Sequence, residues 1–177
     1  LVVAHPRQRV GDAGVVGAQL VGALDKAGGF VEVAAFFEEA VAEVVQGDGA
    51  LRTGPFGSAL RHSEFVAEGV PVLGIDNVVR NRFVWAERRY ITPAKFAELR
   101  RYRVQPGDVL VSLMGTVGRT AVVPDGIGDA VNTKHLAAIT LDRTKGEPEY
   151  LAAALRLDPE VVHQLNAAGR GAIMTGL

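Results

Sequence analysis

The first part of the chain contains two stretches in which apolar residues recur every three or four positions. The repeat is weak and interrupted by glycine over residues 12–27, and it is stronger over residues 32–46, where glutamates occupy the opposite side. Such spacing predicts two amphipathic helices. Gly47-Asp48-Gly49 follows the second stretch and indicates its end. We therefore predict a helical appendage over residues 1–48.

From residue 49 onward, short apolar and β-branched runs alternate with turn residues. This pattern predicts strands at Val70–Ile75, Arg82–Ala86, Arg89–Ile91, Asp108–Leu113, Arg119–Val123 and Val131–Leu141. The Gly-containing loop at 114–118 is short enough to join its two flanking strands as a hairpin. Proline, glycine and aspartate predict further turns at 105–108 and 124–126.

Helix signals occur at three places in this second part. Thr92-Pro93 provides an N-cap followed by proline at the first helical position, and we expect Phe96 and Leu99 to face inward. Pro148–Leu157 and Pro159–Ala168 are further predicted helices. The order of elements lacks the regular strand–helix alternation of a parallel sheet. We predict an α+β domain over residues 49–177, with a mixed, mostly antiparallel, barrel-like β core and flanking helices.

Residues suited to catalysis are not grouped in any familiar pattern. The chain has no cysteine, and its four histidines lie far apart in the sequence, which argues against thiolate and zinc chemistry. It contains no Gly-x-Ser-x-Gly elbow, no phosphate-binding Gly-Lys-Ser/Thr loop and no Asn-Pro-Pro-aromatic motif of adenine methyltransferases. We predict a non-catalytic protein with no metal and no cofactor of its own. No apolar run approaches the ~20 residues of a membrane span, so we expect a cytoplasmic protein with no membrane partner.

Charge is distributed unevenly around a net value of −1. Residues 51–145 carry fourteen basic and nine acidic side chains, whereas both ends of the chain are acidic. Such asymmetry favours a polyanionic partner, although a solvated surface gives the same pattern. The densest basic stretch runs from Arg80 to Arg103 and includes Trp85, which is either a core residue or a stacking platform. We favour the core, because an indole brings a large apolar area to a small domain.

Three polar turns are suited to contacting phosphate. Thr53–Ser58 and Gly115–Arg119 combine glycine with a hydroxyl or guanidinium donor, and Asn132–His135 gathers donors and a positive charge before an apolar run. Exposed backbone amides and such side chains bind phosphate oxygens. Each segment is equally compatible with an ordinary structural turn.

Taken in order, these segments resemble the target recognition domain of the type I restriction-modification specificity subunit. The resemblance rests on Thr53–Ser58, Gly69–Asn77, Tyr90–Met114, Gly115–Pro124, Lys134–Leu136 and the tail from Glu149 to Gly171. It implies an α+β, partly barrel-like domain that reads one half of a bipartite target in double-stranded DNA. It also implies a partner methyltransferase subunit that uses S-adenosylmethionine to methylate adenine, and a translocating restriction subunit as a further partner. The expected DNA contacts are Ser58, Arg61, Asn77, Arg80, Arg82, Arg119, Lys134 and His135.

Two alternatives remain open at this stage. The first 48 residues do not resemble the usual start of this family, so the chain is also interpretable as a protein-interaction or regulatory module that docks a methyltransferase and binds DNA weakly. A fragment of a fused restriction-methylation enzyme is the other alternative, because the chain begins with Leu1 and not with methionine.

Overall fold

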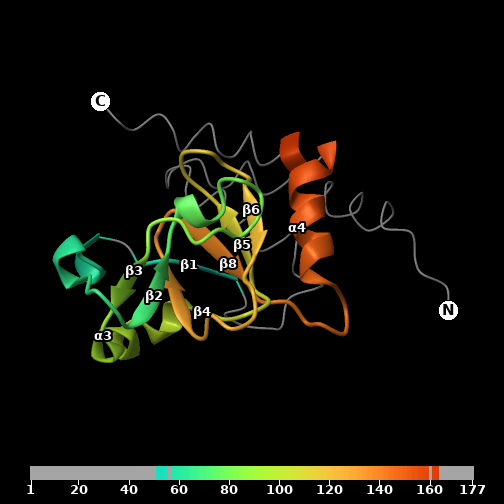
Figure 1. Cartoon of the computed structure of the whole chain (residues 1–177). Coiled ribbons are helices and arrows are strands. Elements are labelled where there is room, and N and C mark those ends of the chain that lie inside the picture. Colours follow the sequence, from blue (N-terminus) through green and yellow to red (C-terminus); the bar gives the residue numbers. More distant parts are fainter. Residues whose placement is uncertain (1–50, 56, 160, 164–177) are drawn as a thin grey trace, which may run out of the picture.

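The computed structural model describes residues 51–55, 57–159 and 161–163 of the chain (Figure 1). These residues form two β-sheets, two α-helices and several short 3₁₀ turns. The helices predicted at 12–27 and 32–46, and the boundary near residue 48, lie outside the described residues.

The first sheet consists of four antiparallel strands. Its spatial order is β1 (Leu51–Thr53), β8 (Leu136–Ile139), β5 (Val109–Ser112) and β6 (Thr120–Val122). The hairpin of β5 and β6 confirms the pairing predicted from the 114–118 loop, since Val111 lies opposite Thr120.

Both faces of this first sheet are buried. Val109 and Val111 of β5 point to one core together with Leu155, whereas Leu110 between them belongs to a second core with Leu73 and Val104. Successive residues of a strand point to opposite faces, so the uniformly apolar run of β5 fits a strand that is covered on both sides. The α4 helix (Pro148–Leu157) covers the first face, and the second sheet covers the other.

The second sheet mixes parallel and antiparallel pairs. Its order is β3 (Arg89–Ile91), β2 (Val70–Leu73), β7 (Ala130–Asn132) and β4 (Arg103–Val104), and only β2 and β7 run parallel. The prediction of an α+β fold with a mixed, mostly antiparallel core is confirmed. The described strands nevertheless form two separate four-stranded sheets and not a closed barrel.

Two predicted strands are wrong. Val131–Leu141 is not continuous, because a turn at 133–135 divides it into β7 in one sheet and β8 in the other. The side-chain amide of Asn132 closes this turn by donating to the carbonyl of Leu136 at 2.7 Å. Arg82–Ala86 is a loop, since Val84 bonds back to the carbonyl of Asn77 and joins no sheet.

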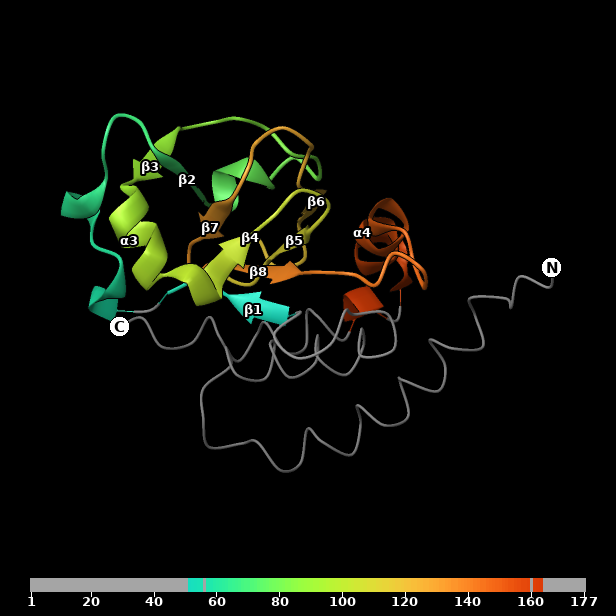
Figure 2. The ribbon, with the colours of Figure 1, turned by 90° about the horizontal axis from the view of Figure 1, so that it is seen from below.

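The two described α-helices lie on opposite flanks of the β core (Figures 1 and 2). The α3 helix (Pro93–Glu98) begins as predicted, with the Thr92 hydroxyl accepting a hydrogen bond from the amide of Lys95 at 3.1 Å. Leu99 just after it is buried against Val72 and Ile91 of the second sheet. The predicted helix at Pro148–Leu157 is α4, and residues 159 and 161–163 are helical as well. None of the helices in the described part of the chain is long and apolar enough to cross a membrane.

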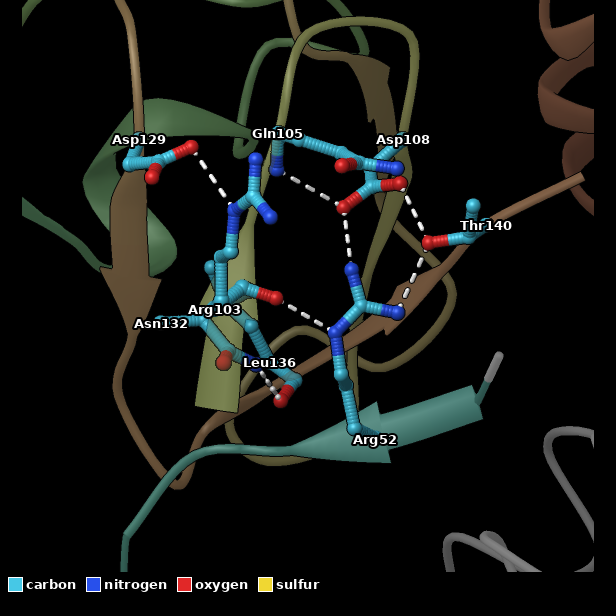
Figure 3. A network of polar contacts seen from close by, with 8 residues as sticks. All are labelled: Arg52, Arg103, Gln105, Asp108, Asp129, Asn132, Leu136 and Thr140. Carbon is cyan, nitrogen blue, oxygen red and sulfur yellow. Dashed lines mark hydrogen bonds and ion pairs between the residues drawn. The ribbon is translucent and has the colours of Figure 1, made fainter. Parts of the chain in front are cut away.

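A buried polar network links the two sheets (Figure 3). Arg52 of β1 donates to Asp108 at 2.5 Å and to the Thr140 hydroxyl at 2.8 Å, and its Nε atom donates to the carbonyl of Arg103 in β4. Asp108 also accepts from Thr140 at 2.6 Å and from the amide of Gln105 at 2.9 Å. One guanidinium therefore ties the first sheet to the second.

We expect Arg52→Met to lower the free energy of unfolding by about 3–5 kcal/mol, because it leaves the Asp108 carboxylate buried without its cation. Burial raises the pKa of Asp108 above its usual value even beside Arg52, and loss of Arg52 raises this pKa further. In the folded variant, the Asp108 carboxyl group then binds its proton more tightly than it does in the unfolded chain, where the pKa of aspartate is about 3.9. The destabilisation should therefore be smallest near about pH 4 and grow as the pH rises through the folded pKa.

Denaturant unfolding of Arg103→Met provides the control for this prediction. Arg103 and Asp129 form an ion pair at 2.7 Å whose side chains are 43% and 40% exposed. Exposed pairs contribute less than about 1 kcal/mol. Equal losses in the two variants, or a loss in Arg52→Met that does not depend on pH, would contradict the assigned role of Arg52.

Candidate nucleic-acid interface

The strand register brings three loops from distant parts of the sequence to one end of the two sheets. β5 ends and β8 begins at the pair Ser112 and Leu136, while β2 and β7 end side by side at Leu73 and Asn132. The segments that leave these strand ends are 74–83, 113–119 and 133–135, and we call them together the loop end. Gly115 and Ile75 are close enough that a Cβ atom on Gly115 would lie 3.6 Å from the Ile75 side chain.

A glycine next to the loop end allows the chain to pass close to β7. A Cβ atom at Gly54 would lie 2.2 Å from the carbonyl oxygen of Asn132 and from the carbonyl carbon of Thr133. No side chain fits in this space, because both obstacles are backbone atoms. The Gly-Pro turn after β1 is thus a structural part of the frame that carries the loops.

Asn77 holds the first loop in shape. Its side chain is 1% exposed, accepts a hydrogen bond from the amide of Gly74 at 2.8 Å and donates to the carbonyl of Val84 at 2.9 Å. The amide of Val84 donates in return to the carbonyl of Asn77 at 3.0 Å. Asn77 was expected to contact DNA, but the structure uses its amide inside the loop, and we leave it out of the interface proposed below.

Asn81 braces the outer part of the same loop. It has φ +55°, a left-handed conformation that asparagine tolerates better than most residues. Its side chain accepts from the amide of Thr120 in β6 at 3.3 Å, and its carbonyl accepts from Arg156 of α4 at 3.2 Å. Arg80 and Arg82, on either side of Asn81, are both exposed.

The hairpin loop between β5 and β6 is held from within by Ser112. The Ser112 hydroxyl accepts from the amide of Arg119 at 2.8 Å and donates to the carbonyl of Thr116. Gly115 and Gly118 have φ values of +76° and +81°, which side chains rarely adopt. This fixed backbone presents the exposed Arg119 side chain at the start of β6.

The third loop is fixed through its backbone. The amide of Thr133 donates to the carbonyl of Leu73 at 2.8 Å, and the carbonyl of His135 accepts from Leu113 at 2.9 Å. Lys134 is exposed and His135 is half-buried. The pKa of His135 lies below its usual value, mainly because of burial and also because Lys134 and Arg89 are positively charged.

Ser58 and Arg61 lie away from the loop end. Both are exposed and belong to the segment that follows β1. The neighbouring residues Leu60 and Phe65 pack on the second sheet beside α3, so this segment lies on the flank of the domain. The structure therefore brings Arg80, Arg82, Arg119, Lys134 and His135 together and leaves Ser58 and Arg61 separate.

Much of the basic stretch between residues 80 and 103 is used within the domain. Lys95 pairs with Glu64 at 2.8 Å and with Glu98 at 3.0 Å, and Arg89 pairs with Asp76. Trp85 is 36% exposed, so its assignment to the core is wrong. Sequence analysis also missed Asn81, which lies between two arginines and directly before a segment predicted as a strand.

The chemistry of the loop end is that of an anion-binding surface. Arg80, Arg82, Arg119 and Lys134 are exposed cations on backbones fixed by hydrogen bonds. Guanidinium groups bind phosphates and guanine bases in a bidentate manner. Among the described residues, no group of three or more histidine, aspartate and glutamate side chains is arranged to hold a metal ion.

Comparisons with known proteins give similar solved structures and no similar sequence family. No protein-family model and no curated protein matches the chain. A structure of the type I restriction-modification system, described in terms of complex assembly and conformational transition, has 20% identity, covers 88% of this chain and 39% of its own, and has a TM-score of 0.44. The HsdS subunit from Thermoanaerobacter tengcongensis has 19% identity, with 96% and 43% covered and a TM-score of 0.43. The chain thus spans about two fifths of the length of these solved chains.

We expect Asn77→Ala to lower the free energy of unfolding by about 1–3 kcal/mol, because the buried amide of Gly74 and carbonyl of Val84 lose their partner. Thermal or denaturant unfolding measures this effect. Ser58→Ala is the matched control, since Ser58 is exposed and such substitutions change stability by less than about 0.5 kcal/mol. An unchanged stability of Asn77→Ala would show that Asn77 does not hold the loop.

Proposed function

We propose that this chain is a sequence-specific DNA-binding module of a type I-like restriction-modification system, and that the loop end reads one half-site. The observation that carries the proposal is the register of the two sheets, which gathers four exposed cations from three separate loops at one end. The motif order in the sequence supports the same assignment, because it resembles the target recognition domain of a specificity subunit.

The loop end suits both parts of DNA recognition. Exposed arginine and lysine side chains neutralise phosphates and fix the register of the protein on the duplex. Arg119 and Arg82 are also long enough to reach base edges in the major groove, where guanine accepts two hydrogen bonds from a guanidinium. The braced backbone lowers the entropy cost of ordering these loops on binding.

The partners that we propose follow from the resemblance alone. They are double-stranded DNA, a methyltransferase subunit that binds S-adenosylmethionine and modifies adenine, and a restriction and translocation subunit. In this proposal the chain supplies specificity, the chemistry belongs to the partners, and the assembly works in the cytoplasm.

Binding to a randomised duplex pool across a salt series tests this function. The expected result is an enriched short motif and an affinity that falls steeply with salt, since each neutralised phosphate releases counterions. Retention without enrichment would contradict half-site reading by this chain. No retention at low salt, together with a stable complex with a methyltransferase, would favour the protein-interaction alternative.

Arg119→Ala should weaken DNA binding. If Arg119 contacts phosphate, the loss is similar for all sequences and the salt slope falls by roughly one unit. If it reads a base, discrimination at one position falls by about 1–3 kcal/mol. Fluorescence anisotropy with the enriched and a scrambled duplex separates the two cases.

Arg143→Ala is the matched control for Arg119→Ala. Arg143 is equally an exposed arginine, but it follows the other end of β8, close to Gly107 in the turn before β5. Its substitution should leave the affinity unchanged. If both variants lose affinity equally, the surface that binds DNA is not confined to the loop end.

DNA binding should also become tighter as the pH is lowered, through His135. A nearby phosphate favours the imidazolium form and raises the pKa of His135, which is lowered in the free protein. Binding then takes up a proton, so affinity rises as the pH falls from about 8 to about 6. His135→Asn should flatten this part of the pH profile. Parallel profiles for the two proteins would exclude His135 from the interface.

A further inference from the structure

We propose that Trp85 is a specificity-determining residue that contacts the edges of DNA bases from a groove. It would do so from the segment 78–88, which we call the braced loop. This inference rests on the proposed function and names a contact that the basic residues alone do not supply. Trp85 is the one tryptophan of the chain, and it is 36% exposed.

The braced loop is held at its start and in its middle. Asn77 joins its start to Val84 through hydrogen bonds of 2.9 Å and 3.0 Å. Asn81 connects it to β6 and α4 at 3.3 Å and 3.2 Å. Because Thr120 begins β6, these bonds place the loop beside Arg119 at the loop end. An exposed side chain on so fixed a backbone is preorganised for contact.

Trp85 is positioned by two neighbours. Its ring lies 5.2 Å from that of Phe83 at an interplanar angle of 88°, and the guanidinium of Arg88 lies 5.4 Å from the indole centroid. Such contacts limit the rotamers of the indole. Arg88 covers a face of the ring, so insertion between stacked bases would require its displacement. Contact through the exposed part of the indole, in a groove, requires no such rearrangement.

The charge around Trp85 favours DNA over a protein partner. The braced loop carries Arg80, Arg82 and Arg88 against the single acidic residue Glu87. Val79 on the same loop is 39% exposed, so the loop exposes apolar as well as positively charged side chains. The major groove of DNA is complementary to such a surface. Its thymine methyl groups and apolar base edges match the apolar side chains, and the phosphates on either side match the arginines.

The single tryptophan makes a direct test possible with the full chain. Labelled duplex carrying the enriched motif is titrated with protein, and its anisotropy reports binding while selectively excited tryptophan emission reports the environment of Trp85. We expect both signals to change with the same midpoint. Binding seen by anisotropy with unchanged emission would overturn the role of Trp85 and leave the proposed function intact. No binding by anisotropy would instead overturn the proposed function.

Substitution of Trp85 distinguishes sequence-specific contact with bases from nonspecific apolar contact with DNA. Trp85→Ala should weaken binding to the enriched motif by about ten-fold, with a much smaller loss for scrambled DNA, and Trp85→Phe should lie between it and the parent. Tyr150→Ala is the matched control, because Tyr150 is a 58% exposed aromatic residue near the start of α4. An equal loss on both duplexes, or equal losses in Trp85→Ala and Tyr150→Ala, would overturn specificity readout by Trp85.

Discussion

The ion pair between Arg52 and Asp108 is the interaction on which the arrangement of the two sheets depends. Asp108 is 1% exposed, so its carboxylate is removed from water and is stabilised by Arg52, Thr140 and the amide of Gln105. The same guanidinium bonds to the backbone of Arg103 in the other sheet. A buried charge of this kind costs several kcal/mol when it lacks its partner, so one relative placement of the sheets is favoured strongly over others. That placement matters at the opposite end of the strands, because the loops that we assign to DNA come from both sheets.

Local signals in the sequence predicted the elements that depend on neighbouring residues. Thr92 and Pro93 correctly indicated the start of α3, and two β-branched runs around a Gly-containing loop correctly indicated the hairpin of β5 and β6. Pairing between distant segments was not predictable in this way. Val131–Leu141 reads as one strand, but its two halves find partners in different sheets on either side of the turn at 133–135, which the Asn132 side chain closes. Arg82–Ala86 has strand composition, yet the buried amide of Asn77 holds it as a loop.

For the candidate site as well, the sequence indicated the types of residue involved but not their positions in space. Composition indicated that arginines and lysines between residues 51 and 145 would form the interface, but it did not indicate which of them face the same way. Lys95 is engaged in ion pairs with Glu64 and Glu98, whereas Arg119 and Lys134, fifteen positions apart, are brought to one end by the pairing of β5 with β8. Trp85 was assigned to the core on its size alone. Its exposure follows from the loop conformation, which is set by hydrogen bonds of Asn77 and Asn81.

The closeness of Gly54 to β7 has a consequence for how such a domain can change over evolutionary time. Any side chain at Gly54 would strike the backbone of Asn132 and Thr133, so this position is closed to substitution. Arg80, Arg82 and Lys134 are exposed, and the loops that carry them are fixed by backbone atoms and by asparagine side chains. Mutations at these exposed positions leave the frame intact. In the function proposed above, a lineage can therefore acquire a new target sequence through a few surface substitutions, without passing through an unfolded intermediate.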